Sequence, residues 1–199
     1  MSADRVAGLL LAAGAGRRMG GPKALLRDAG GVPFLDRAIG RLLDGGCAGV
    51  TVVLGAAADE ARGVLDEAGW TGDDAVDVVV AVDWEEGMGA SLRAGLRALA
   101  GGPASAALVT LVDLPDVDVP VLRRVLAAGS GPGALARATY GGRPGHPVLL
   151  GREHWPGVAA TAEGDHGARA YLAAHAANAC ECGDLATGRD VDRPEDLGR

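Results

Sequence analysis

The chain has 199 residues, and 48% of them are hydrophobic, so it is long enough to bury the core of an α/β domain and too apolar for wholesale disorder. A formal net charge of −7 and an aromatic content of 3% argue against a general binder of nucleic acid or of anionic membranes. The apolar run before Gly14 is too short for a membrane span, and three scattered cysteines do not form a disulfide framework, which together indicate a cytoplasmic protein with reduced thiols.

Short apolar runs alternate with amphipathic segments over the first two thirds of the chain. We expect strands at Val6–Ala12, Val50–Leu54, Val76–Val82 and Ala106–Val112. We expect helices at Pro33–Leu43, Asp59–Ala68, Ser91–Ala100 and Val119–Ala128. This alternation predicts a mostly parallel sheet with helices on both faces, which is a three-layer α/β/α, Rossmann-like arrangement.

The alternation changes after about residue 129. Turns rich in glycine and proline flank Ala134–Thr139 and Pro147–Leu150, which predicts a β-hairpin. The last expected elements are a helix, a strand and a short helix, at Ala168–His175, near Asn178–Cys182 and after Pro194. We therefore expect a single domain, in which residues 1–129 form one half and residues 130–199 form an elaboration that closes over the ligand edge of the sheet.

The segment after the first expected strand combines glycine with positive charge. Its glycines permit tight turns that aim backbone N–H groups at a polyanion, and Arg18 and Lys23 add charge at the same place. Ala24 follows the lysine where a Walker A loop has Ser or Thr, and Gly20 comes one residue too late for the dinucleotide-binding fingerprint. An ordinary glycine-rich turn is the alternative, but the combination favours a phosphate site.

A carboxylate is expected at the same edge of the sheet. Asp113 follows the fourth strand, and ligands of open α/β sheets bind beyond the carboxyl ends of the strands. Beside a polyphosphate loop, this position suits Mg²⁺, which takes few carboxylates and completes its octahedron with water and phosphate oxygens. The alternative is a helix cap or an Asx turn before Pro115.

The stretch LAAGAGRRMGGPKALL resembles the signature of the nucleotidyltransferases with a MobA-like fold, and the resemblance extends over nearly the whole chain. Its Leu-Ala-Ala-Gly start is similar to the molybdenum cofactor cytidylyltransferase branch, where the guanylyltransferase branch has a glycine in place of Ala13. That methyl group narrows the base pocket, and one methyl contributes about 1–3 kcal/mol of discrimination, here in favour of CTP over GTP. The resemblance implies nucleotide contacts from Leu11, Ala12, Ala13, Gly14, Gly16, Arg17, Gly55 and Ser91.

The same resemblance implies catalytic roles for Lys23, Arg18 and Asp113. The C-terminal DVDRPEDL is similar to the family's last motif and implies that Asp192, and less directly Asp190, completes a site for Mg²⁺ or Mn²⁺ with Asp113. Arg193 departs from the family's threonine in this motif, and Leu114 departs from the glutamine that often follows the first aspartate. The alternatives are a helix N-cap for Asp192 and a helix N-cap for Ser91.

The stretches RPGHPV and GDHGAR are similar to those that face the acceptor in the cytidylyltransferase branch. They imply that His146 and Asp165 orient the acceptor and that Arg169 grips its phosphate; a structural His–Asp pair is the alternative. The implied reaction transfers CMP from CTP to the terminal phosphate of the molybdopterin cofactor and releases pyrophosphate, with a molybdenum hydroxylase as the implied client.

Two classes of alternative function remain open. One is another nucleotidyltransferase of the same fold, which uses GTP or acts on a sugar phosphate or phospholactate. The other is a non-catalytic protein that binds a nucleotide or a cofactor. A dehydrogenase is disfavoured, because the glycine spacing is wrong for it.

Overall fold

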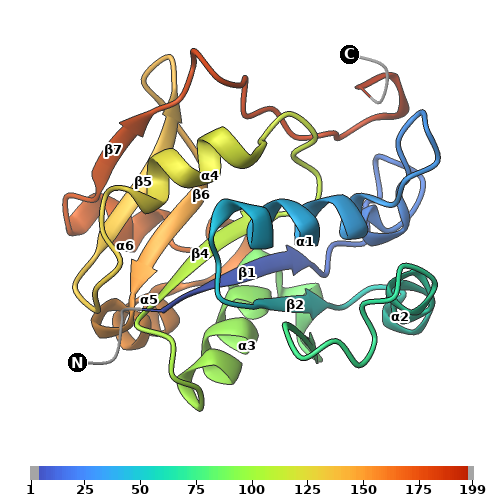
Figure 1. Ribbon diagram of the computed structural model, residues 1–199, viewed down its shortest axis with the longest axis horizontal. Helices are drawn as coiled ribbons and strands as arrows, with labels where there is room; N and C mark the ends of the chain where they lie inside the picture. Colours follow the sequence, from blue (N-terminus) through green and yellow to red (C-terminus); the bar gives the residue numbers. More distant parts are fainter. Residues whose placement is uncertain (1–4, 197–199) are drawn as a thin grey trace.

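Residues 5–196, which are those that the computed structural model describes, build a seven-stranded sheet with helices on both faces (Figure 1). The strands are β1 (Val6–Ala12), β2 (Val50–Leu54), β3 (Val76–Val80), β4 (Ala106–Leu111), β5 (Leu135–Tyr140), β6 (Arg143–Gly151) and β7 (Asn178–Glu181). The helices are α1 (Phe34–Gly45), α2 (Ala58–Glu67), α3 (Met88–Ala100), α4 (Val119–Leu126), α5 (Trp155–Thr161) and α6 (Arg169–Ala174). The expected three-layer α/β/α architecture is confirmed.

The strand order is β3-β2-β1-β4-β6-β5-β7. The first four strands of the chain pair in parallel, whereas β6 runs antiparallel to both β4 and β5, and β7 runs parallel to β5. The expected hairpin therefore continues the sheet from β4 outward. Both halves of the chain share one sheet, and the second half brings Asp165, before β7, and Asp192, after it, to the edge at the carboxyl ends of β1 and β4.

Two apolar cores lie on opposite faces of this sheet. Alternate residues of each central strand point to opposite faces, so Leu10 packs with α1, α2 and α4, while its neighbour Leu9 packs with α3, α5 and α6. Because both faces are buried, the central strands carry continuous apolar runs. Gly95 lets α3 approach β1 closely, since a Cβ at this position would lie 2.5 Å from Leu9 Cδ1.

Several element boundaries differ from the expectation, and strand β6, for example, begins at Arg143 and not at Pro147. Helix α3 begins at Met88, three residues before Ser91, because Gly87 supplies the left-handed φ of 112° from which the helix starts. Strand β3 ends at Val80, and the side chain of Val82 beyond it is 82% exposed. Helix α5 was not expected, because Pro156 and Gly157 suggest a turn, although proline is well suited to the first turn of a helix.

Among residues 5–196, no helix combines the length and the apolar character that crossing a membrane requires.

Candidate active site

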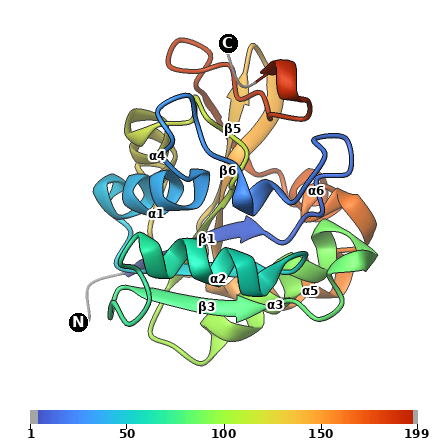
Figure 2. The same cartoon turned by 90° about the vertical axis from the view of Figure 1, so that its right-hand side faces the viewer.

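A cleft of about 520 Å³ opens at the carboxyl ends of β1 and β4, within the usual size range of small-molecule sites. Figure 2 shows the loop after β1 in blue and the C-terminal segment in red on the same side of the molecule, and both border this cleft. The expected site residues in its wall are Leu11, Ala12, Ala13, Gly14, Gly16, Arg17, Arg18, Lys23, Ser91, Asp113, Asp165 and Asp192. Gly55, His146 and Arg169 are not in the wall.

The loop after β1 is held by a tight turn and one buried side chain. The carbonyl of Gly16 accepts hydrogen bonds from the N–H groups of Met19 (2.8 Å) and Gly21 (3.3 Å). Gly16 has a left-handed φ of 56°, and a Cβ there would overlap the Gly21 carbonyl. The Met19 side chain is 8% exposed and packs into the core, which anchors the loop to the rest of the domain. Within residues 5–196, no protein atom accepts a hydrogen bond from the N–H groups of residues 14–18, which leaves them available to an anion.

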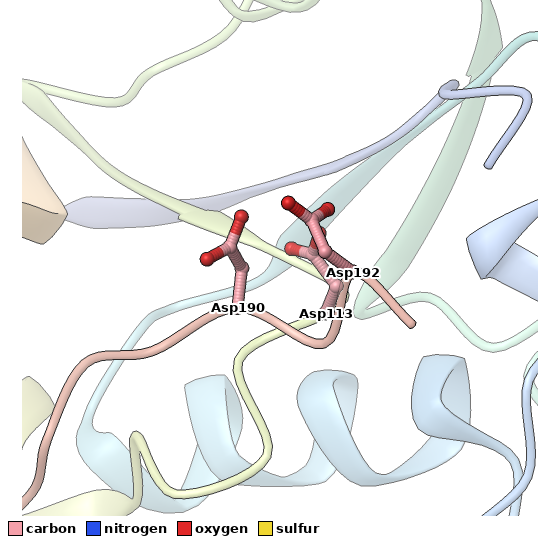
Figure 3. Close-up of side chains that lie close together, drawn as sticks. All are labelled: Asp113, Asp190 and Asp192. Carbon is pink, nitrogen blue, oxygen red and sulfur yellow. The ribbon is translucent and has the colours of Figure 1, made fainter. Parts of the chain in front are cut away.

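Three carboxylates gather beside this loop, and two of them, Asp113 and Asp192, lie in the cleft wall. Oxygen atoms of Asp113, Asp190 and Asp192 all lie within 4.8 Å of one another (Figure 3). The backbone N–H of Val191 donates to the carbonyl of Asp113 at 2.9 Å, and the Val191 side chain is 2% exposed. Anchoring this residue in the core places the acids on both sides of it beside Asp113.

Lys23 bridges two of these carboxylates. Its Nζ lies 2.5 Å from Asp113 Oδ2 and 2.6 Å from Asp192 Oδ1, while Arg18 Nη1 lies 3.6 Å from the other oxygen of Asp192. Burial opposes the charged form of Lys23, but the carboxylates outweigh it and raise the pKa of Lys23. Burial raises the pKa of Asp113 against the influence of Lys23, and the hydrogen bond from Lys23 lowers the pKa of Asp192.

This donor set fits a hard divalent cation. Mg²⁺ and Mn²⁺ prefer carboxylate oxygens, and they keep several positions for water and phosphate oxygens. The alternative role of Asp113 as a helix cap does not apply, because Asp118 caps α4 by accepting from the N–H of Val119. Ser91 lies inside α3 with its side chain 4% exposed, so it is not a helix cap, whereas Asp192 accepts a hydrogen bond from Lys23.

The wall opposite the loop is formed by side chains from the segment before α3 and from the first turn of α3. Trp84, Glu85 and Met88 line the cleft next to Ser91. Gly55 lies behind this wall, because a Cβ there would be 2.7 Å from Cβ atoms of Ala13 and Trp84. The glycine after β2 therefore leaves room for the side chain of Trp84, a site residue that no local sequence pattern marks.

The residues expected to contact the acceptor divide into two groups. Asp165 lies in the cleft wall. His146 is half-buried on β6, where the guanidinium of Arg137 lies near it, and Arg169 begins α6. In the described part of the chain, no hydrogen bond or ion pair joins His146 to Asp165, so the alternative of a structural His–Asp pair finds no support there.

Comparisons with known proteins agree with this geometry. The family model described as "MobA-like NTP transferase domain" matches residues 8–179. Nicotine blue oxidoreductase from Paenarthrobacter nicotinovorans is 38% identical over 206 residues, which cover 98% of this chain and 95% of that protein. The crystal structure of Rv0371c from Mycobacterium tuberculosis is 28% identical with a TM-score of 0.77 and covers 98% and 96% of the two chains. A structure of Rv0371c in complex with manganese is 27% identical with a TM-score of 0.68 and covers 89% and 86%.

Proposed function

The chain belongs to the family of MobA-like NTP transferase domains, and from this membership we propose that it transfers CMP from CTP to the phosphate monoester of a molybdopterin-type acceptor and releases pyrophosphate. The single observation that carries the proposal is the position of Lys23, between two carboxylates and beside a loop of unpaired N–H groups. A site with this charge pattern suits the triphosphate of a nucleotide together with a divalent cation.

In the proposed reaction the loop and the basic side chains bind the triphosphate. The N–H groups of residues 14–18, with Arg18 and Lys23, hold the β- and γ-phosphates and stabilise pyrophosphate as it leaves. The acceptor phosphate is already ionised near neutral pH, so it attacks the α-phosphorus in line without a general base. Catalysis then consists of positioning and charge neutralisation.

Asp113 and Asp192 would hold Mg²⁺ or Mn²⁺, with Asp190 as a neighbour of the site. The ion would supply charge neutralisation at the phosphates of both substrates. The neighbouring structure in complex with manganese supports a divalent ion in proteins of this kind.

The base would lie against Ala13, Ser91 and Trp84 at the other end of the cleft. The methyl group of Ala13, a residue of the cleft wall, would reduce the room for a purine, which favours CTP. Residues 1–129 would bind the nucleotide and residues 130–199 the acceptor, in a cytoplasmic reaction that supplies a molybdenum hydroxylase.

An oxidoreductase is the second candidate, because the relative that is 38% identical is named nicotine blue oxidoreductase. Reduction by a nicotinamide nucleotide would also use a phosphate-binding loop, but it would leave the acids that surround Lys23 without a role. The two candidates therefore differ in their need for a divalent ion and for Asp113.

The test is pyrophosphate release from each of the four NTPs, with Mg²⁺ and with molybdopterin-type acceptors, run beside an assay of NADH and NADPH oxidation. We expect release from CTP, and a loss of about 100-fold or more in kcat for Asp113→Asn. Asp118→Asn is the matched control, since asparagine also caps a helix and the variant should retain activity. Oxidation of a nicotinamide nucleotide without pyrophosphate release from any NTP would favour the second candidate instead.

A further inference from the structure

Arg93 is a partly buried arginine of α3 that does not line the cleft but joins two segments that do. Its Nη2 lies 2.5 Å from Glu86 Oε2, in the short 3-10 helix η2 (Trp84–Glu86) that precedes α3. Its Nη1 donates to the carbonyl of Ala162, the residue that follows α5, at 2.6 Å. Glu86 is exposed whereas Ala162 is buried, so solvent screens the contact with Glu86 more strongly than the bond to Ala162.

The two joined segments carry different parts of the cleft wall. Trp84 and Met88, two residues on either side of Glu86, line the cleft from the start of α3. Asp165, the residue expected to orient the acceptor, lines it from the 3-10 helix η4 (Gly164–His166) after α5. Arg93 therefore connects the wall beside the expected base position to the wall that the second half of the chain supplies.

Glycines let the backbones of these two segments touch. A Cβ at Gly87 would lie 2.6 Å from the carbonyl carbon of Gly164 and 2.7 Å from Asp165 Oδ1. A Cβ at Gly89 would lie 2.8 Å from the carbonyl carbon of Ala162. Because the two glycines bring no side chains to the contact, side-chain packing at these positions does little to fix its geometry.

Arg93 supplies a directional bond across this contact. Among residues 5–196, no backbone hydrogen bond joins residues 84–92 to residues 161–167. A guanidinium is a planar fork that donates to two acceptors in fixed directions, and here Glu86 and Ala162 each take one of its nitrogens. The pair of bonds therefore sets the orientation of the guanidinium and the separation of the two segments.

We propose that Arg93 is a positioning residue, which fixes the separation between Trp84 and Asp165 across the cleft and so holds the acceptor in line with the α-phosphorus of the nucleotide. The reaction in this statement rests on the proposed function, but the connection between the two segments does not. In-line transfer is sensitive to position, because a misplacement of about 1 Å lowers a rate about 100-fold. The phosphate loop after β1 does not take part in the contact, so loss of Arg93 should lower kcat far more than the affinity for CTP.

The connection itself is tested by hydrogen exchange of the full chain, followed by mass spectrometry. The N–H groups of Ala162 and His166 are hydrogen-bonded, so their exchange reports the opening of the segment after α5. We expect Arg93→Met, which removes both donors, to speed exchange in this segment about tenfold or more and to leave residues 14–23 unchanged. Arg97→Met removes an exposed arginine one turn further along α3 and is the matched control, with changes below twofold in both segments.

The positioning role is tested by steady-state kinetics of the same variants with CTP, Mg²⁺ and a molybdopterin-type acceptor. We expect Arg93→Met to lower kcat about tenfold or more while the KM for CTP changes less than threefold. Arg93→Lys keeps the charge but not the fork, so it should recover only part of the rate, and it gives the same test if Arg93→Met does not fold. Arg97→Met should retain the wild-type kcat.

The remaining outcomes separate the two proposals. Exchange after α5 that is unchanged in Arg93→Met overturns the connection. Faster exchange together with an unchanged kcat overturns the positioning role, because Arg93 then serves only the fold. Faster exchange in Arg93→Met, when the wild type transfers no NTP, supports the connection and overturns the nucleotidyl-transfer proposal.

Discussion

The Lys23→Met substitution removes the ammonium group that bridges Asp113 and Asp192 and leaves a side chain of similar length. In the structure this ammonium occupies the place between the two carboxylates that a divalent cation would need. A metal ion that enters without nucleotide must therefore displace it. We expect the variant to bind Mn²⁺ more tightly than the wild type when no nucleotide is present.

The size of the effect follows from the contact between Lys23 and Asp113, which is the more buried of the two contacts that Lys23 makes. The side chains of Lys23 and Asp113 are 16% and 10% exposed, whereas that of Asp192 is 40% exposed, so solvent screens the second contact more strongly. A hydrogen bond to a charged group contributes about 1.5–3 kcal/mol. If Mn²⁺ entry costs the bond to Asp113, the variant binds Mn²⁺ about 10- to 100-fold more tightly.

The assay is a titration in which electron paramagnetic resonance measures unbound Mn²⁺. It is run at pH 8, because burial already raises the pKa of Asp113 and loss of Lys23 raises it further. Arg18→Met is the control: Arg18 lies 3.6 Å from Asp192 and is 78% exposed, so we expect a change below about fivefold. A folded Lys23→Met variant that binds Mn²⁺ no more tightly than the wild type would refute the reasoning.

Three further predictions concern Gly16, Gly55 and Glu181. Gly16→Ala should fold but lose nucleotide affinity by more than tenfold in a CTP titration, because its Cβ would overlap the Gly21 carbonyl at a left-handed φ. Gly55→Ala should lower the free energy of unfolding by about 1–3 kcal/mol in urea, because the added methyl collides with Trp84. Glu181→Gln should lower the Tm at pH 7. The folded pKa of Glu181, about 2, lies below its usual 4.5, so the acid stabilises the fold above pH 4.5 and the Tm difference should vanish as the pH falls towards 2.

The central fold was predictable because its signals are local. The strands at Val6–Ala12 and Val50–Leu54 are buried on both faces, so their apolar runs are continuous and their limits stand out. The hairpin was harder to delimit, because the first two residues of β6, Arg143 and Pro144, are exposed and the next two are only partly buried. A strand that is half in solvent loses the pattern by which it is recognised.

The strand ends predicted one part of the site, and the family resemblance predicted Asp165 and Asp192, which also line the cleft. Lys23 and Asp113 each follow a strand of the parallel sheet, and a shared edge brings such residues together. The contact between Lys23 and Asp192 spans 169 positions of the chain and depends on the path after β7, which no local pattern specifies. Trp84 was missed for the same reason, since its neighbours in the cleft wall come from distant segments.

The anchoring of Val191 has a practical consequence for anyone who handles this protein. The segment that carries Asp190 and Asp192 is tied down by Val191 and by Thr187, whose N–H and hydroxyl both donate to Asp116 at 2.6 Å. Cleavage of the polypeptide just ahead of Thr187 would leave all seven strands in the larger fragment, but it would separate from them two of the three acids and the buried Val191 side chain.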